Sequence, residues 1–315
     1  MGTTPGAYHP RPRPYVMRTG KMRKAPGRRK RSGVSACGSQ TRAASRSAAG
    51  DLPGLRPHRG AGEAALGDGG AGLAHVHLAE AAQHRAVQGV AAGADRLDSL
   101  CRDFILAHDA VPAPLNYRGF PKSICTSINH VVCHGIPGER RLEDGDILNI
   151  DITVILNGWY GDTSRMYVAG TANTRAKRLI DVTYESLMLG IAAVKPGATL
   201  GDIGHAIQSF VEPQRFSIVR DFCGHGIGRR FHEPPNILHY GRAREGTTLR
   251  PGMFFTIEPM VNAGRSDVKI LDDGWTAVTR DRSLSAQFEH MVGVTKDGCE
   301  IFTLSPAGMM KPPYD

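Results

Sequence analysis

Two aspartates lie close together on a predicted β-hairpin, and their charges need compensation. Asp151 and Asp162 flank the dipeptide Asn157-Gly158, which is the strongest short-range signal for a two-residue type I′ turn because both central positions require positive φ. Such a turn places Asp162 opposite Thr153, diagonal to Asp151, with the two side chains roughly 7 Å apart or closer. Carboxylates this close repel each other, so the pair requires a shared proton, a basic neighbour or a metal cation.

Three further residues with metal-binding side chains follow the hairpin. A predicted strand over 253–259 ends near Glu258, and a predicted strand over 287–295 carries Glu289. His225 lies between two glycines after a predicted strand over 216–219. Four carboxylates and one imidazole suit divalent first-row ions such as Mn, Fe or Co, which accept mixed oxygen and nitrogen ligands. Each residue taken singly also fits a structural role, as a solvated acid or a core histidine.

The elements that must position these residues follow from apolar periodicity. The first hairpin strand alternates, so one face is buried and the face with Asp151 is polar; the buried set is Leu148, Ile150, Ile152, Val154 and Leu156. Helices are predicted over 97–109, 175–194 and 200–211, and a further strand over 123–129. Gly93-Ala94 and Gly197-Ala198 precede similar apolar patterns, which suggests a weak internal repeat.

The first part of the chain differs sharply in composition from the rest. Residues 1–100 carry 16 Lys/Arg against 6 Asp/Glu, whereas residues 101–315 carry 23 against 24. Residues 1–95 contain no Ile, Phe, Asn or Trp, so they offer little apolar surface to offset the entropy of folding. We therefore predict a basic, low-complexity extension over 1–94, a catalytic domain over 95–306 and a tail over 307–315.

Three interpretations of the extension remain open. The first is a transit peptide, although prolines interrupt any amphipathic helix there. A nucleic-acid-binding arm is another, although its basic cluster lacks interleaved aromatic residues. The third is a disordered or wrongly assigned segment, in which His75, His77 and His84 are solvated and bind no metal.

Cysteine usage and hydropathy predict a cytoplasmic protein. The six cysteines show no Cys-x-x-Cys spacing, which fits free thiols in a reducing compartment. No apolar run approaches the roughly 20 residues that a membrane-spanning helix needs. We therefore expect no membrane association.

From about residue 95 to 304 the chain resembles the type I methionine aminopeptidases, which are pita-bread metallopeptidases. The resemblance rests on five motifs in order: Asn149-Ile150-Asp151 with Gly161-Asp162-Thr163-Ser164, Cys223-Gly224-His225-Gly226-Ile227-Gly228, Phe231-His232-Glu233, Thr256-Ile257-Glu258-Pro259-Met260, and Ser285-Ala286-Gln287-Phe288-Glu289-His290. It implies an α+β pita-bread fold, with two pseudo-symmetric helix-and-strand halves around a curved antiparallel sheet.

The resemblance also implies a metal site. Asp162 and Glu289 would bridge two divalent ions, which could be Co, Mn, Fe or Zn. Asp151 would bind one ion, and His225 and Glu258 would complete the other. Two cations roughly 3.5–4 Å apart lower the pKa of a bridging water, which is the expected nucleophile. Glu258 is the expected proton shuttle.

Substrate contacts are implied in the same way. His134 and His232 match two histidines that bind the scissile peptide without binding metal. The methionine side chain would occupy an apolar pocket lined by Tyr117, Phe120, Cys125, Phe231 and Trp275, where sulfur–aromatic contacts add modest affinity.

The function implied is removal of the initiator methionine from nascent proteins with a small second residue. The expected partners are nascent polypeptide N-termini and, transiently, the ribosome, and the expected state is a monomer. The alternatives are a pita-bread peptidase that acts on Xaa-Pro bonds, and a non-catalytic relative that binds ribosomes or nucleic acid through the basic extension.

The chain departs from the resemblance near its start. The segment Lys21-Met22-Arg23-Lys24-Ala25 resembles the first helix of the family. It lies too far from residue 95, and the residues between lack apolar periodicity. We therefore predict that the first half lacks its outer helix.

Overall fold

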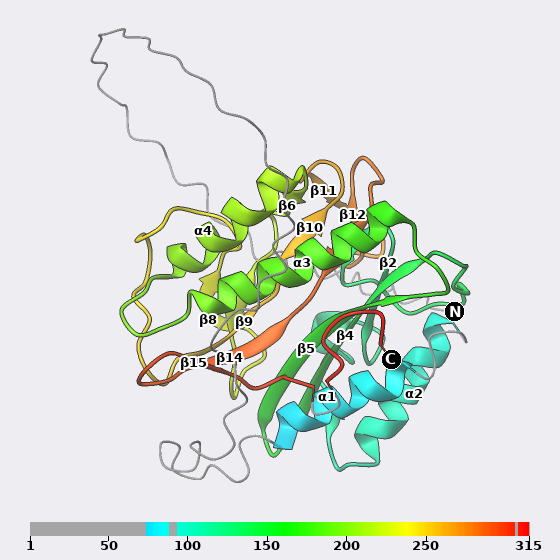
Figure 1. The fold of residues 1–315 in the computed structure, drawn as a ribbon. Helices are drawn as coiled ribbons and strands as arrows, with labels where there is room; N and C mark the ends of the chain where they lie inside the picture. The colour runs from blue at the N-terminus through cyan, green and yellow to red at the C-terminus, as the bar shows by residue number, and fades with distance from the viewer. Residues whose placement is uncertain (1–73, 88–92, 306–307, 315) are drawn as a thin grey trace, which may run out of the picture. The chain divides into compact units, whose positions relative to one another are not determined.

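The computed structural model describes residues 74–87, 93–305 and 308–314. Within them, long helices pack on antiparallel sheets (Figure 1). The helices are α1 (Ala74–Val87), α2 (Ala94–Leu106), α3 (Thr174–Ala192) and α4 (Leu200–Val211), with short 3₁₀ turns at Tyr117–Gly119 and Glu212–Gln214. The strands are β1 (Val111–Pro112), β2 (Cys125–Ile128), β3 (Val131–Cys133), β4 (Ile147–Leu156), β5 (Trp159–Val168), β6 (Ser217–Ile218), β7 (Gly224–Gly226), β8 (Glu233–Ile237), β9 (Phe254–Ile257), β10 (Met260–Asn262), β11 (Val268–Ile270), β12 (Ala277–Thr279), β13 (Ser285–Gln287), β14 (His290–Val294) and β15 (Cys299–Ile301).

The β4–β5 hairpin has the register that the sequence predicts. Asn157 and Gly158 form its turn with φ values of 52° and 77°, and Thr153 pairs with Asp162. β1 and β2 also pair with β4. The predicted helices over 97–109, 175–194 and 200–211 correspond to α2, α3 and α4 and are confirmed within a few residues.

The two faces of this hairpin have different environments. The apolar face of β4 packs against α1 and α2, and Leu148, Ile150, Ile152 and Val154 are all fully buried there. The opposite face carries Asp151 and Asp162, as the alternation predicts. The hairpin therefore connects a helix-covered core on one side with a polar pocket on the other.

Helix α1 corrects two predictions. Residues 74–87 fold, so the predicted start of ordered structure at residue 95 is too late, and the first half does have an outer helix. The helix binds the hairpin through polar groups: buried Glu80 forms an ion pair with Arg165, and Gln83 Nε2 donates to the carbonyl oxygens of Ile150 and Thr163 at 2.8 and 3.0 Å. His77 is exposed, as expected. The side chains of His75 and His84 and the Lys21–Ala25 segment lie outside the described residues.

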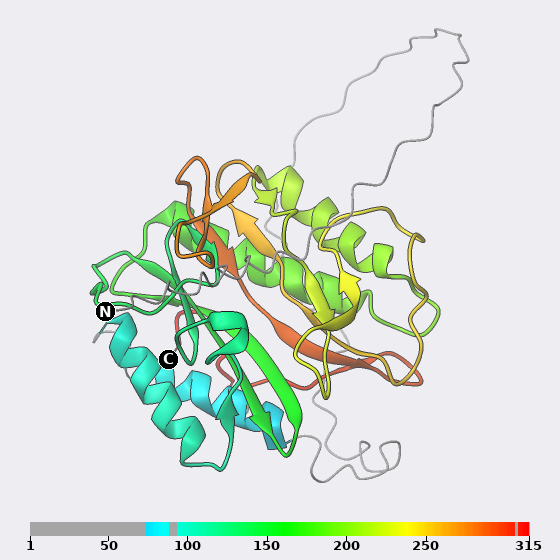
Figure 2. The ribbon, with the colours of Figure 1, turned by 180° about the vertical axis from the view of Figure 1, so that it is seen from behind.

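In the second half of the fold, α3 and α4 pack against strands that include β6, β8, β9, β10 and β13 (Figure 2). Sequence-encoded caps begin both helices. Asn173 Oδ1 accepts from the Ala176 backbone N–H, and Thr199 forms a capping box with Asp202. Each such cap satisfies a backbone donor that the helix cannot satisfy itself. The core here is shared by the helices and by strands β6, β8, β9, β10, β13 and β14, together with Ile147 of β4 and Met166 of β5.

The predicted strand over 287–295 is wrong in one respect. The structure has two strands, β13 and β14, separated at Phe288 and Glu289. At this break the Glu289 backbone N–H donates to the Ser164 carbonyl oxygen at 3.0 Å, because the chain leaves one sheet and crosses to β5. The break therefore places Glu289 beside the hairpin face that carries Asp162.

The end of the chain packs on both halves. Tyr314 donates through its hydroxyl to the Met166 carbonyl oxygen on β5 at 2.7 Å, and Lys311 pairs with Asp181 on α3 at 2.6 Å. Residues 308–314 of the predicted tail are thus held against β5 and α3. None of the helices in the described part of the chain is long and apolar enough to cross a membrane.

Candidate metal centre

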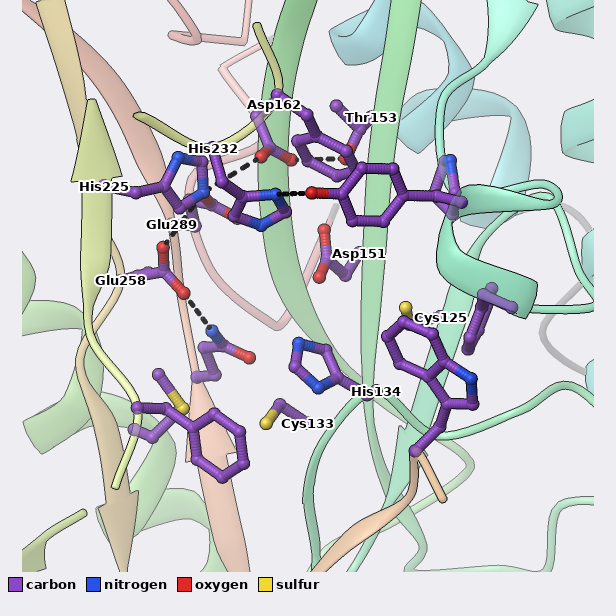
Figure 3. Close-up of a pocket in the computed structure, with 18 of the residues that line it drawn as sticks. Cys125, Cys133, His134, Asp151, Thr153, Asp162, His225, His232, Glu258 and Glu289 are labelled. Carbon is purple, nitrogen blue, oxygen red and sulfur yellow. Dashed lines mark hydrogen bonds and ion pairs between the residues drawn. The ribbon is translucent and has the colours of Figure 1, made fainter. Parts of the chain in front are cut away.

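Every side chain that the sequence singles out as a site residue lines one pocket (Figure 3). The acids and histidines are Asp151, Asp162, His225, Glu258, Glu289, His134 and His232, and the expected methionine-binding residues are Tyr117, Phe120, Cys125, Phe231 and Trp275. These residues come from segments that are far apart in the sequence. The fold therefore brings the whole predicted set together.

Three buried side chains form the tightest part of the pocket. One ligand atom each from Asp162, His225 and Glu289 lies within 4.8 Å of the other two. His225 Nε2 is 3.7 Å from Asp162 Oδ2 and 3.7 Å from Glu258 Oε1. In Figure 3 these four side chains converge on one region, with Asp151 beside them.

Glycines allow the His225 segment to approach its neighbours closely. A Cβ on Gly224 would lie 2.3 Å from the Thr256 carbonyl oxygen, and a Cβ on Gly226 would lie 2.4 Å from the Pro234 carbonyl oxygen. Real Cβ atoms do not approach oxygen that closely, so only glycine fits at both positions. The Gly-His-Gly sequence thus seats β7 between β8 and β9 and points His225 into the cluster.

The hydrogen bonds of His225 fix its tautomer. Its Nδ1 lies 3.1 Å from the Gly226 carbonyl oxygen, which can only accept, so Nδ1 carries the hydrogen and Nε2 presents a lone pair to the cluster. Burial lowers the pKa of His225 to about 4. The imidazole is therefore neutral at pH 7, as a metal ligand must be.

The carboxyl groups carry an unfavourable concentration of charge. Burial raises the pKa of Asp151 to about 7. Burial, and then the nearby acids, raise the pKa values of Asp162, Glu258 and Glu289 well above their usual range. None of the described residues that line the pocket is a lysine or an arginine. An oxygen-rich donor set with one neutral imidazole and no basic neighbour fits divalent cations.

Glu258 is held by three partners that the sequence analysis did not assign to the site. Thr256 Oγ1 donates to its Oε1 at 2.8 Å, and Gln287 Nε2 donates to its Oε2 at 3.2 Å. The Glu258 backbone N–H donates to His239 Nε2 at 3.0 Å. Both carboxylate oxygens are therefore oriented before any ligand binds.

We expect Gln287→Met to lower activity by about 10- to 100-fold or to weaken metal binding by a similar factor, because it removes the donor that orients Glu258. The measurements are kcat/KM and a metal-binding isotherm. Gln208→Met on α4, remote from the pocket, is the control. Unchanged values for both quantities in Gln287→Met would show that Glu258 does not need this hydrogen bond.

The metal-free protein should lose stability as pH rises above about 6.5. The carboxyl pKa values are raised, so the folded state keeps protons that an unfolded chain has already released, and stability falls as pH rises through the folded pKa of about 7 for Asp151. The pKa values of His134 and His225 are lowered, so these two groups make stability increase as pH rises. This effect ends at their ordinary pKa of 6.5. We therefore expect EDTA to lower Tm more at pH 8 than at pH 6.5. An equal decrease at both pH values would contradict the charge argument.

Aromatic side chains form the walls of the pocket. Phe120 and Trp275 make an edge-to-face pair with ring centroids 5.3 Å apart, and Tyr117 and Phe231 pack at 4.9 Å. Such pairs leave an apolar surface that accommodates an unbranched side chain. The pocket thus joins an apolar region to the cluster of acids.

His134 and His232 both face this space as neutral groups. Burial lowers the pKa of His134 to about 4. Burial first, and then the neighbouring His225, His134 and Arg118, lower the pKa of His232 to about 2. His232 Nδ1 lies 3.0 Å from the Tyr117 hydroxyl. A neutral imidazole can donate or accept a hydrogen bond at a substrate amide.

Several pocket residues were not assigned a role from the sequence. Thr153 Oγ1 donates to Asp162 Oδ1 at 2.7 Å, and the hairpin register could have indicated this pair. Cys223, Met260 and Gln287 stand inside motifs quoted for other residues. Nothing in the sequence indicated the remaining lining residues, Pro114, Cys133 and Phe222.

Comparisons with known proteins find similar sequences and a similar structure. The model of the family described as metallopeptidase family M24 matches residues 71–296. A methionine aminopeptidase of Rickettsia prowazekii is 65% identical over 219 residues, covering 69% of this chain and 85% of that protein. The Escherichia coli methionine aminopeptidase is 55% identical over 218 residues, covering 69% and 82%. A crystal structure of the Rickettsia prowazekii enzyme superimposes with a TM-score of 0.73 at 60% identity, covering 73% of this chain and 94% of that one.

Proposed function

Since this chain belongs to metallopeptidase family M24, with methionine aminopeptidases among its 55–65% identical relatives, we propose that it removes the initiator methionine from nascent proteins whose second residue is small. The observation that carries the proposal is the single pocket that combines Asp151, Asp162, His225, Glu258 and Glu289 with aromatic walls. The acids suit hydrolysis that depends on divalent metal ions. The aromatic walls suit a peptide substrate whose first residue has an apolar side chain.

The proposed site holds two divalent ions. Asp162 and Glu289 would be shared between them, Asp151 would bind one, and His225 and Glu258 would bind the other. Divalent ions bound there would acidify a water molecule and stabilise negative charge that develops on the substrate carbonyl. The identity of the ions follows from availability, since the same ligands accept Co, Mn, Fe or Zn.

The protein side chains supply proton transfer and substrate orientation. Glu258, with both oxygens oriented by Thr256 and Gln287, is the proposed group that accepts a proton from water and delivers it to the leaving amine. His134 and His232 are proposed to hold the scissile peptide group. The hydrogen bond between the Tyr117 hydroxyl and His232 Nδ1 restricts the rotation of that ring.

The substrate preference provides the test. The metal-loaded protein should release methionine from a Met-Ala peptide far faster than it cleaves an Ala-Pro peptide, because the aromatic pocket binds a methionine side chain. Preference for the Ala-Pro peptide would favour the hypothesis of a peptidase that acts on Xaa-Pro bonds. Absence of cleavage with Mn, Co or Fe would exclude both enzymatic hypotheses.

The N-terminal extension allows a second test. Deleting residues 1–73, which leaves α1 in place, should keep kcat/KM within about twofold, because every described residue that lines the pocket lies between residues 114 and 289. A protein that acts as a ribosome- or nucleic-acid-binding module through its basic arm would instead lose its function. Loss of catalysis in a folded protein that lacks residues 1–73 would contradict the proposal.

The cellular setting is proposed on the same grounds. The substrates are the N-termini of nascent polypeptides, which requires transient contact with the ribosome in the cytoplasm. The proposed working state is a monomer, because the described residues of one chain supply every acid and histidine of the pocket.

A further inference from the structure

The tip of the β4–β5 hairpin contacts a short segment of the second half. We call this segment, residues 228–232, the rim loop. The Tyr160 backbone N–H donates to the Gly228 carbonyl oxygen at 2.9 Å. The guanidinium of Arg229 lies over the Trp159 ring, 4.4 Å from its centroid. The hairpin thus fixes the first residues of the rim loop.

The last residues of the rim loop form one side of the pocket. Phe231 and His232 both line it, and their ring centroids are 4.1 Å apart. Phe231 also packs on Tyr117, whose hydroxyl lies 3.0 Å from His232 Nδ1. A displacement of Phe231 would therefore move both the apolar wall and a proposed substrate-binding imidazole.

Tyr160 supports this wall from behind. Its ring stacks on Phe231 with centroids 5.5 Å apart and an interplanar angle of 21°. Tyr160 is not among the residues that line the pocket. It lies two residues before Asp162 on β5, so both side chains project from the same face of the hairpin.

We propose that Tyr160 is a positioning residue that sets selectivity for methionine by holding the Phe231 ring and, through it, His232. The inference rests on the proposed function, because selectivity is defined by the aminopeptidase reaction. Without the Tyr160 ring, Phe231 loses its stacking partner and the wall can admit other side-chain shapes. A displacement of about 1 Å in a positioning group can cost on the order of 100-fold in rate.

The test compares Tyr160→Leu and Tyr160→Phe in the full, metal-loaded chain. The measurements are kcat/KM for a Met-Ala and a Leu-Ala peptide, Tm, and a metal-binding isotherm. We expect Tyr160→Leu to lower kcat/KM for the Met-Ala peptide by about tenfold and to lower the Met/Leu selectivity ratio, with unchanged metal affinity. Tyr160→Phe keeps the ring stack and should restore both rate and ratio to within about twofold.

The control separates positioning from general stability. Trp159→Leu removes the Arg229 contact at the same turn but leaves the Tyr160–Phe231 stack, so the selectivity ratio should stay unchanged. An unchanged ratio in folded Tyr160→Leu, with only a lower Tm, would overturn the inference. If the wild-type protein itself does not cleave the Met-Ala peptide, the proposed function fails instead, so the two failures are distinguishable.

Discussion

Asp162→Asn is expected to abolish metal-dependent hydrolysis, with a loss of more than about 100-fold in kcat/KM, while the hairpin stays folded. Asp162 contributes one of the three closest ligand atoms in the cluster. An asparagine amide has one neutral oxygen and cannot bind two cations as a carboxylate can. The apolar face of β4, with Leu148, Ile150 and Ile152, is untouched by the change.

In the metal-free state, Asp162→Asn should be at least as stable as the wild-type protein. Thr153 Oγ1 donates to Asp162 Oδ1 at 2.7 Å, and the asparagine carbonyl can accept that bond. Burial and the charge of Asp151 raise the pKa of Asp162, so a neutral side chain removes a repulsion from the metal-free protein.

Activity, a metal-binding isotherm and Tm in EDTA together test this expectation. The predicted pattern is lost activity and weakened metal binding, with a Tm in EDTA equal to or above that of the wild type. Normal activity would contradict the assignment of Asp162. A large decrease in Tm in EDTA would contradict the electrostatic argument.

Glu80→Ala is expected to destabilise the folded protein by about 3–5 kcal/mol, because it leaves the buried Arg165 guanidinium without its carboxylate. Glu80 also accepts from Thr163 Oγ1 at 3.1 Å, so this donor loses a partner as well. Burial raises the pKa of Glu80, and the Arg165 charge lowers it in part. Denaturant unfolding monitored by circular dichroism gives the difference in free energy.

Two further variants show whether charge or packing causes the loss. The double variant Glu80→Leu with Arg165→Met removes both charges and should recover most of the stability, because apolar groups of similar volume often replace a buried ion pair without cost. Asp297→Asn, in the exposed pair with Lys296, should change the free energy of unfolding by less than about 1 kcal/mol. A loss below 1 kcal/mol in Glu80→Ala would show that α1 is not held by this pair.

Local signals in the sequence predict the hairpin well. The Asn157-Gly158 turn and the alternation of β4 depend on neighbouring residues, so they determine both the register and which face is polar. The positions of Asp151 and Asp162 follow directly from them. The convergence of His225, Glu258 and Glu289 depends on contacts between distant segments, so only the resemblance to a known family could predict it.

Helix α1 could not be predicted because its buried face mixes the apolar side chains of Val76 and Leu78 with alanine and polar side chains. Ala79, Ala82, Glu80 and Gln83 are among its buried side chains, and a pattern of alanine, acid and amide does not indicate a buried face. The partners of Glu80 and Gln83 on β4 and β5 are more than 60 residues away. The buried Glu80 carboxylate would be unfavourable alone, and Arg165 stabilises it. No local sequence pattern reveals this ion pair.

The break at Glu289 was missed for a related reason. Residues 287–295 have the apolar character of one strand, but the Glu289 backbone bonds to Ser164 rather than to a neighbouring strand of the same sheet. The bridge to Ser164 places the Glu289 carboxylate in the cluster with Asp162 and His225.

Titration of the metal-stripped protein with Mn²⁺ tests the central claim most directly. Methionine release from a Met-Ala peptide should be absent in EDTA, return as Mn²⁺ is added in excess of the chelator, and not return in Asp162→Asn. Release that continues at the wild-type rate in EDTA, or that Mn²⁺ restores equally in Asp162→Asn, would contradict the assignment of this pocket as a metal-dependent aminopeptidase site.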